Sequence, residues 1–373
     1  MQIIIAIIIA IIVYSLQNRL YRKMWDKGLK ISAEFNEAYM EVEEKATLTL
    51  VVSNAKKLPL PVLHVKFSAP RYFIFDDTMN ASVTDLYYRN DAFSVMGGQK
   101  ITRVLGFTAT KRGYYEISGI NVIAKNFFMT QTYAKTLHTG TSIYVFPKKY
   151  KDVPFVNMAR EILGDMEVRH RLIEDPYTFR GIREYSTQDG MNRINWKASA
   201  KTGKLMVNLY NQTSEQKVKL LLNLDTNIMV KSDYIRELCI ELTSSIGFEM
   251  TKNGISVMLA SNGEDTKGNS MGKTEYGASQ NHMIELDKYL AGIGGQGDAL
   301  EFLQILDHEF DDDDGYTSYI IISAYCKADL IDRLDYMWQN GISVYMIVPY
   351  YDQYGLEVDR PYIHAREVIL NDT

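Results

Sequence analysis

Residues 175–210 have the sequence DPYTFRGIREYSTQDGMNRINWKASAKTGKLMVNLY, and they separate two sequence patterns in a chain of 373 residues. Before this stretch, short apolar segments alternate with turn residues at the period of two that is typical of β-strands. After it, buried-strand runs alternate with segments of helical period. We therefore expect a β domain followed by an α/β domain, as the length of the chain also favours about two domains.

The composition of the chain limits the classes of protein that it fits. With 46% hydrophobic and 23% charged residues, it is an ordinary globular sequence. The formal net charge of −5 gives no basic field of the kind that nucleic-acid-binding proteins use. The two cysteines, Cys239 and Cys326, lie in or beside apolar runs, so we expect reduced core residues and no oxidising compartment.

The first sixteen residues, MQIIIAIIIAIIVYSL, form an almost wholly apolar run. As a helix this run is about 24 Å long, whereas the hydrocarbon core of a bilayer is roughly 30 Å thick. Tyr14 and Tyr21 at the interface and a snorkelling Arg19 would extend its reach. We interpret residues 1–18 as a membrane anchor helix. The alternatives are a buried or truncated segment and a signal peptide, although no charged region precedes the run and no small-x-small cleavage site follows it.

Basic residues follow the apolar run, and they are Arg19, Arg22, Lys23, Lys27 and Lys30. The positive-inside rule places the side of a membrane helix that carries such residues in the cytoplasm. We therefore expect a single-pass protein of the cell membrane whose soluble body is cytoplasmic.

Residues 28–147 are predicted to form an antiparallel β-sandwich. The segments LKISAEFN, KATLTLVVSN and LPVLHVKFSAP alternate apolar and polar residues, with turn residues between them. One apolar group, Phe127, Phe128 and Met129, follows Asn126. It is either a core plug between strands or an exposed binding patch.

Residues 215–373 are predicted to form a doubly wound α/β domain. Four buried-strand runs, VKLLLNLD, ISVMLA, YIIIS and ISVYMIV, alternate with helical segments. Residues 148–214 are assigned to a linker and motif segment, whose first part is expected to be a short helix or ordered linker.

Charge is dense in the motif segment. Residues 175–204 hold six basic side chains and three acidic ones, an excess of +3. Two interpretations stay open: an Arg–carboxylate knot that fixes an irregular segment, or a surface that captures an acidic partner or a phosphate.

A helix is predicted between Asp189 as its N-cap and Gly203 as its C-terminal stop, with a strand after it. On such a helix, Arg193 and Lys197 share one face because they are four residues apart. Trp196 lies on another side, and we expect it to be anchored in the core.

The string REYSTQDGMNRINWKASAKTGKLMV, residues 183–207, resembles the signature of the domain of unknown function 58 family. That signature is approximately Arg-x-Tyr-x-x-Gly-Asp, an Arg two or three residues later, then Ile-Asp-Trp-x-x-Ser-Ala-Arg. The matching positions are Arg183, Tyr185, Asp189, Arg193, Ile194, Trp196, Ser199 and Ala200. Gln188, Asn195 and Lys201 replace the usual Gly, Asp and Arg.

The resemblance implies N-terminal membrane helices, a β-sandwich, the motif and a domain similar to von Willebrand factor A. It also implies a membrane-tethered partner of a MoxR-type AAA+ ATPase, with no established catalysis. The candidate partner-binding or structural residues are Arg180, Arg183, Tyr185, Asp189, Arg193, Trp196, Lys197 and Lys201.

Domains similar to von Willebrand factor A often bind a metal ion through Asp-x-Ser-x-Ser and a later Thr and Asp, whose oxygen atoms suit Mg²⁺. Here Asp225 is kept, Asn227 and Met229 follow it, Gly297 stands near the Thr position and Ser323 replaces the later Asp. Asp225, Asn227 and Ser323 are therefore degenerate positions, and we expect neither a metal nor another cofactor.

The sequence favours a membrane-tethered, non-catalytic scaffold or adaptor that binds a MoxR-type AAA+ ATPase or a client protein during complex assembly or maturation. No Ser-His-Asp, Cys-His or paired-carboxylate set follows from the spacing of residues. A metal-dependent hydrolase and a phosphate- or nucleic-acid-binding protein are the alternatives, although nucleic acid is not an expected partner.

Overall fold

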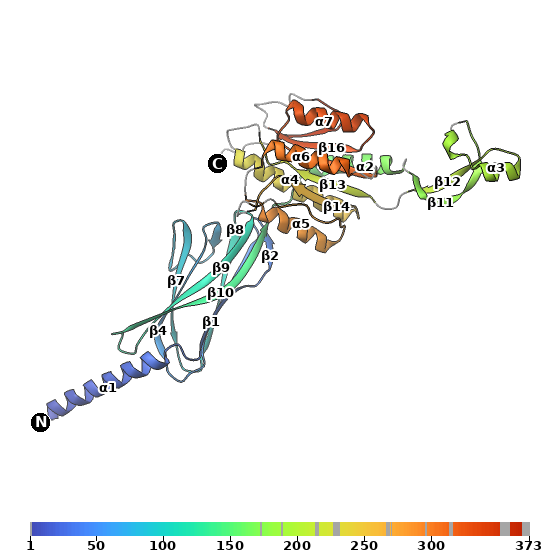
Figure 1. Ribbon diagram of the computed structural model, residues 1–373. Coiled ribbons are helices and arrows are strands. Elements are labelled where there is room, and N and C mark those ends of the chain that lie inside the picture. Colours follow the sequence, from blue (N-terminus) through green and yellow to red (C-terminus); the bar gives the residue numbers. More distant parts are fainter. Residues whose placement is uncertain are drawn as a thin grey trace. The chain divides into compact units, whose positions relative to one another are not determined.

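The chain forms two compact units, Met1–Lys148 and Lys149–Thr373, in the computed structural model (Figure 1). The structure describes residues 2–171, 174–187, 189–212, 216–226, 232–265, 269, 271–294, 297–312, 316–350 and 359–367.

The first unit begins with α1 (Gln2–Met24), which among the described helices is the one long and apolar enough to cross a membrane, with a mean hydropathy of 2.1. Its C-terminal end is part of the domain that follows. Tyr21 is 2% exposed and donates a 2.8 Å hydrogen bond to the carbonyl of Pro59, and the Trp25 ring stacks on Tyr133. Tyr21 therefore differs from its predicted interfacial role, because the domain core takes its side chain.

Two sheets follow in the first unit. The four-stranded sheet has the order β1 (Leu29–Phe35), β3 (Lys45–Asn54), β8 (Lys100–Ala109) and β5 (Phe73–Phe75). The six-stranded sheet has the order β2 (Tyr39–Glu41), β10 (Thr132–Phe146), β9 (Gly113–Lys125), β4 (Leu60–Pro70), β7 (Leu86–Val95) and β6 (Ala81–Val83). Among the described strands of both sheets, the short β2–β10 pair is parallel and the other pairs are antiparallel.

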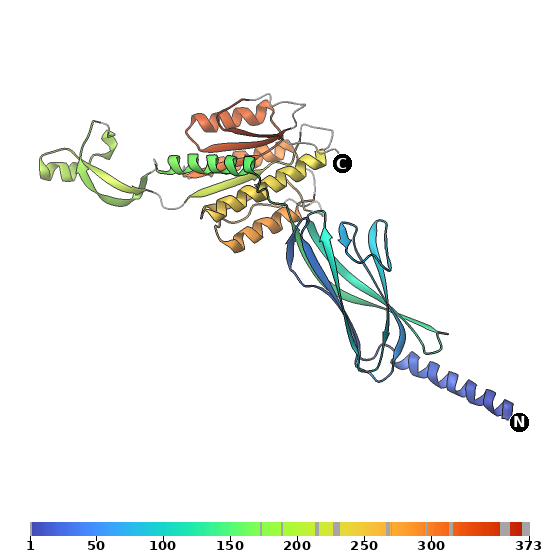
Figure 2. The same ribbon diagram turned by 180° about the vertical axis from the view of Figure 1, so that it is seen from behind.

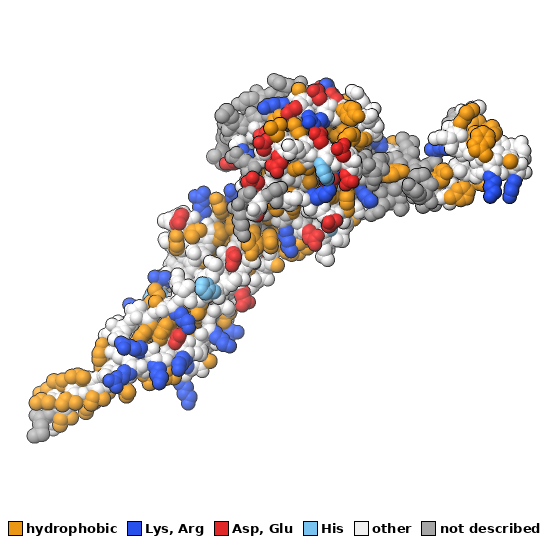
Figure 3. All heavy atoms as spheres, viewed as in Figure 1, with side chains coloured by type: hydrophobic (Ala, Val, Ile, Leu, Met, Phe, Trp, Pro, Cys, Tyr) orange, Lys and Arg blue, Asp and Glu red, His pale blue; other side chains and the backbone are white. Residues whose placement is uncertain are grey.

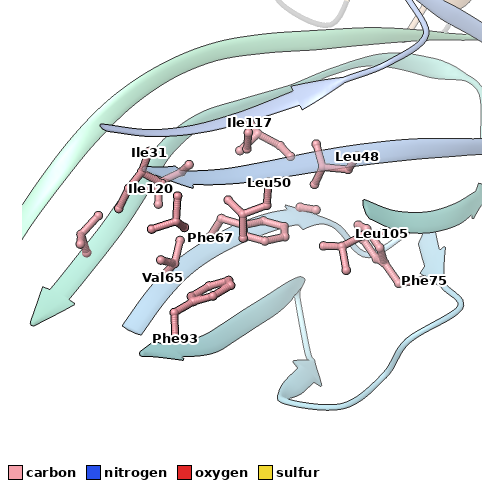
Figure 4. Close-up of a cluster of buried hydrophobic side chains, with 14 of the residues drawn as sticks. Ile31, Leu48, Leu50, Val65, Phe67, Phe75, Phe93, Leu105, Ile117 and Ile120 are labelled. Carbon is pink, nitrogen blue, oxygen red and sulfur yellow. The ribbon is translucent and has the colours of Figure 1, made fainter. Parts of the chain in front are cut away.

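The core of this unit is built by the alternation that the sequence predicts. Along β3, every second residue from Ala46 to Val52 is buried, because side chains of a strand point to opposite faces in turn. Leu48 and Leu50 meet Val65 and Phe67 of β4 in the cluster drawn in Figure 4. The predicted antiparallel β-sheets are thus confirmed.

The second unit is built on a five-stranded parallel sheet. Its order is β14 (Ser256–Ser261), β13 (Lys217–Leu222), β15 (Thr317–Ile322), β16 (Val344–Tyr350) and β17 (Ile363–Glu367). The helices are α2 (Val153–Arg171), α4 (Ser232–Lys252), α5 (Gln280–Gly292), α6 (Ala299–Asp311) and α7 (Ala328–Gln339).

Separate apolar clusters cover the two faces of this sheet. Leu220 and Leu222 of β13 pack with α2, α4 and α5, whereas Leu221 packs with α6 and α7. The two ribbon views show these helices around the sheet (Figures 1 and 2). Strands buried on both faces are expected to be continuous apolar runs, as β13 is. The sequence predicts a short helix or ordered linker before the motif, and the structure has the 19-residue α2, whose Phe155 and Ile162 are fully buried.

Candidate functional site

The motif segment forms a small sheet of its own. Strands β11 (Glu174–Glu184) and β12 (Met206–Gln212) pair antiparallel as a two-stranded sheet. A 3₁₀ turn, η1 (Met191–Arg193), and the short helix α3 (Trp196–Thr202) lie between them in sequence. We call residues 174–212 the motif hairpin.

A two-pronged ion pair holds the turn after β11. The Arg183 guanidinium donates to Asp189 through Nη1–Oδ2 at 2.6 Å and Nη2–Oδ1 at 2.5 Å. Asp189 Oδ2 also accepts a 2.8 Å bond from the Ser186 amide. Arg183 lowers the pKa of the Asp189 carboxyl, since a donor that stays charged favours the ionised acid. This is the Arg–carboxylate knot that the sequence allowed as one interpretation.

The helix cap differs from the predicted one. Asn195, and not Asp189, caps α3: its Oδ1 accepts a 2.9 Å bond from the Ala198 amide. Its Nδ2 donates to Asn208 Oδ1 on β12 at 2.8 Å, a bond that an aspartate here would lack. Gly203 ends the helix with φ of 72°, as predicted, because glycine adopts this left-handed conformation without strain.

The predicted single helix is interrupted at Ile194. This residue is extended, is 9% exposed and forms a bridge with Val207 of β12. Arg193 therefore belongs to the 3₁₀ turn and Lys197 to α3, so the two do not share one helix face. Trp196 is 69% exposed and is not the expected core anchor, because Ile194 and Val207 occupy the buried positions.

The exposed surface of the motif hairpin combines large apolar and basic side chains (Figure 3). The exposed apolar residues are Phe179, Ile182, Met191, Trp196 and Leu205. The exposed basic residues include Arg180, Arg193, Lys197, Lys201 and Lys204. Tyr185 is half-buried, and its amide donates to the Leu205 carbonyl at 2.9 Å. The basic candidate residues therefore share this surface with exposed apolar residues, of which the sequence predicts only Trp196 as a candidate.

A second polar cluster lies at the carboxyl edge of the parallel sheet, where β13, β14 and β15 end. Asn223, Asn262 and Ser323 are at most 2% exposed. Asn223 Nδ2 donates to Ser323 Oγ at 3.0 Å, and Asn262 Nδ2 donates to Asn223 Oδ1 at 2.9 Å. Asn223 and Asn262 were not predicted as site residues, and Ser323 was named only as a degenerate metal position. The signal for the cluster was a polar residue at the end of each of three successive buried runs.

The degenerate metal positions fall around this cluster. Ser323 Oγ accepts hydrogen bonds from Asn223 Nδ2 and from the Tyr325 amide at 3.0 Å, and it donates to the Tyr325 carbonyl at 3.1 Å. Asp225 is half-buried, whereas Asn227 and Met229 lie outside the described residues. Across the described parts of the chain, no group of three His, Cys, Asp or Glu side chains is arranged to hold a metal ion.

Gly297 stands near the position at which a von Willebrand factor A-like metal site has a threonine, and the space around Gly297 does not admit a larger side chain. A Cβ built on Gly297 would lie 2.5 Å from the Asn262 side-chain amide. That amide also accepts from the Leu224 amide at 2.9 Å and donates to the Asp298 carbonyl at 2.9 Å. The Asn262 side chain thus fills the space that a larger residue at position 297 would need.

Tyr325 lies beside the same edge. Burial, followed by its 2.7 Å hydrogen bond to Asp329 and the nearby Asp225 and Asp298, raises the pKa of its phenol to about 12. Asp298 caps α6 through a 2.8 Å bond from the Leu300 amide.

The family model described as "Protein of unknown function DUF58" matches residues 181–292, which include the motif. No curated protein matches the chain. Among solved structures, a CARDB domain from Pyrococcus furiosus is 16% identical, with 30% of this chain and 90% of that chain covered and a TM-score of 0.19. A non-cellulosomal cohesin from Archaeoglobus fulgidus is 12% identical, with 31% and 91% covered and a TM-score of 0.22. Both TM-scores lie below 0.5, so these likenesses carry no argument.

Proposed function

We propose that this chain is a membrane-tethered, non-catalytic adaptor whose motif hairpin binds a protein partner, a MoxR-type AAA+ ATPase or its client. The observation that carries the proposal is the exposure of Trp196 beside exposed basic side chains. Tryptophan and arginine dominate the few residues that supply most of the binding energy at protein interfaces. A hairpin of this composition suits a partner surface that is acidic around an apolar pocket.

The hydrogen bonds of the motif hairpin support this assignment. Arg183 and Asp189 fix the turn, and Asn195 fixes α3 against β12, so the exposed Trp196 is presented from a preorganised backbone. Preorganisation reduces the entropy that is lost on binding. On this proposal the charged side chains of the motif hairpin have two roles: Arg183 and Asp189 support the turn, and the other exposed basic side chains contact the partner.

The anchor is the second part of the proposal. α1 continues without a break from the apolar run to Tyr21, which the sandwich buries, and this continuity favours an anchor over a cleaved signal peptide. The basic residues after the run favour a cytoplasmic body. We also assign the second unit to the von Willebrand factor A-like class, which its parallel sheet with helices on both faces supports.

The binding proposal is tested with the full chain in lipid nanodiscs and a purified MoxR-type ATPase encoded in the same genome. Trp196→Ala should weaken binding about 30-fold, equivalent to the ~2 kcal/mol of an interface hot spot. Tyr336→Ala is the matched control, since Tyr336 of α7 is 59% exposed and lies outside the motif hairpin. Equal binding by the two variants and the unsubstituted chain would overturn the hairpin as the contact surface.

A further inference from the structure

The β9–β10 turn, residues 126–131, is fixed by one buried side chain. Asn126 is 0% exposed, and its Oδ1 accepts from the Thr130 amide at 2.8 Å and the Gln131 amide at 3.1 Å. Its Nδ2 donates to Thr130 Oγ1 at 2.9 Å and to Asn18 Oδ1 of α1 at 2.7 Å. The turn therefore has a defined shape, and it is tied to the membrane helix.

Two further contacts define the level of the turn along α1. The Phe128 amide donates to Gln17 Oε1 at 3.4 Å, and the Tyr14 hydroxyl donates to Thr130 Oγ1 at 3.3 Å. The Tyr14 and Phe128 rings lie 6.2 Å apart between centroids. Positions 14, 17 and 18 are neighbours on one helix face. The turn consequently lies beside the last turn of the apolar run.

The side chains at the tip of this turn face outward. Phe127, Phe128 and Met129 are 59%, 48% and 59% exposed, so the core-plug interpretation is wrong and the patch is exposed, as its alternative requires. Met129 has φ of 57°, a left-handed conformation that costs a residue with a Cβ about 1 kcal/mol or more. Glycine would avoid that strain. Three bulky apolar residues here therefore contribute little to the folding of the chain itself.

We propose that Phe127, Phe128 and Met129 insert into the headgroup boundary of the bilayer that α1 enters, as a second membrane contact of the sandwich. The proposal rests on the proposed anchor. Bilayer lipid is the occupant because the turn is bonded to α1 at the end of the apolar run, where aromatic residues favour the interface. Exposed Arg19, Arg22 and Lys23 follow on α1 and suit anionic headgroups, and Lys and Arg side chains gather over the adjoining part of the sandwich (Figure 3).

The insertion is tested by spin labels on the full chain, reconstituted at one copy per nanodisc of mixed zwitterionic and anionic lipid. Labels are placed at Phe128→Cys, at Ile8→Cys within α1 and at Val83→Cys on β6, which is 61% exposed. Burial raises the pKa of the Cys239 thiol to about 12 and that of Cys326 to about 11, so the native thiols react slowly with the label.

The readout is the collision rate of each label with oxygen, which enters lipid, and with a nickel chelate, which stays in water. We expect the Phe128→Cys label to meet the nickel chelate several-fold less often than the Val83→Cys label. Met129→Cys repeats the measurement should Phe128→Cys fold poorly. Single-copy discs contain neither a partner protein nor a second chain, and burial in protein would lower contact with both reagents. Rare contact with the nickel chelate together with frequent contact with oxygen at position 128 therefore indicates lipid.

The Ile8→Cys label separates failure of this inference from failure of the anchor. A lipid-embedded label at position 8 with labels at 128 and 129 as water-accessible as the one at 83 overturns the insertion and leaves the anchor intact. A water-accessible label at position 8 overturns the anchor, and the insertion falls with it.

Discussion

The carboxyl edge of the parallel sheet and the motif hairpin both gather polar side chains, but they use them differently. At the sheet edge, Asn223, Asn262 and Ser323 are buried and bond to one another and to backbone groups. In the motif hairpin, Trp196 and several basic side chains are exposed. The difference indicates that the polar groups of the edge stabilise the fold, whereas those of the hairpin are accessible to a partner.

The largest effect is expected from removing the centre of the edge cluster. Asn223→Ala removes one side-chain partner each from Asn262 and Ser323 in a buried site, although both keep bonds to backbone groups. The free energy of opening should therefore fall by about 3 kcal/mol. Native-state hydrogen exchange at the slowest β13 amides measures this change in the full chain. Asn281→Ala, at an exposed position of α5, is the control and should have little effect. If the free energy of opening fell by less than about 1 kcal/mol, the polar cluster at the sheet edge would not be a major source of stability, and the contrast with the motif hairpin would fail.

A smaller loss, about 2 kcal/mol, is expected for Gly297→Thr, because overpacking a filled site forces its neighbours to move. Asn262 is the neighbour in question. The double variant Gly297→Thr, Asn262→Ala should therefore lose less stability than the sum of the two single variants, measured by the same exchange experiment. Gly164→Thr is the control, since a Cβ on that glycine meets no atom within 4 Å. Strict additivity would contradict the proposed exclusion of a side chain at 297.

A weaker, pH-dependent effect is expected at the ion pair of the motif hairpin. The folded state lowers the pKa of Asp189, so the pair stabilises the hairpin above the ordinary aspartate range, and this stability disappears as pH falls through the lowered pKa. In Arg183→Ala, the Asp189 carboxyl should titrate at a higher pH, which carbon NMR of the carboxyl group detects. The stability difference between the two chains should close in acid. An unchanged Asp189 titration would show that Arg183 does not support the turn.

The smallest effect on stability is expected for the residue with the largest proposed effect on binding. Trp196→Ala should change the stability of the hairpin by no more than about 0.5 kcal/mol, because its side chain is mostly in water. Exchange rates of the β12 amides provide the measurement. A markedly faster exchange would mean that Trp196 supports the fold, and loss of partner binding in this variant would then need a structural explanation.

Much of the fold follows from the sequence because its signals are local. The period of two in residues 45–54 predicts the buried face of β3, and the apolar runs of the second half predict the parallel strands. Gly203 is also a local signal: a helix often ends at a residue in the left-handed conformation, which favours glycine, and Gly203 ends α3 in this way. Each of these features is decided by residues that are neighbours in the chain.

The features that the sequence did not reveal depend on contacts between distant segments. The residues around Ile194 continue a helical pattern, but its bridge to Val207 interrupts the helix, so tertiary structure overrides local propensity. Asn223 and Asn262 become a cluster only because their strands are adjacent in the sheet. Tyr21 follows the apolar run closely enough to suggest an interfacial residue, yet the sandwich core takes it.

The burial of Tyr21 and Trp25 has a mechanical consequence. These side chains lie in and just after the final turn of α1, and both belong to the apolar core of the sandwich, so no slack segment separates helix from sandwich. Rotation of α1 about its axis is therefore coupled to rotation of the sandwich. A force that acts on the sandwich would therefore be transmitted to α1, because no flexible linker lies between them to absorb it. The orientation of the sandwich therefore depends on the orientation of α1.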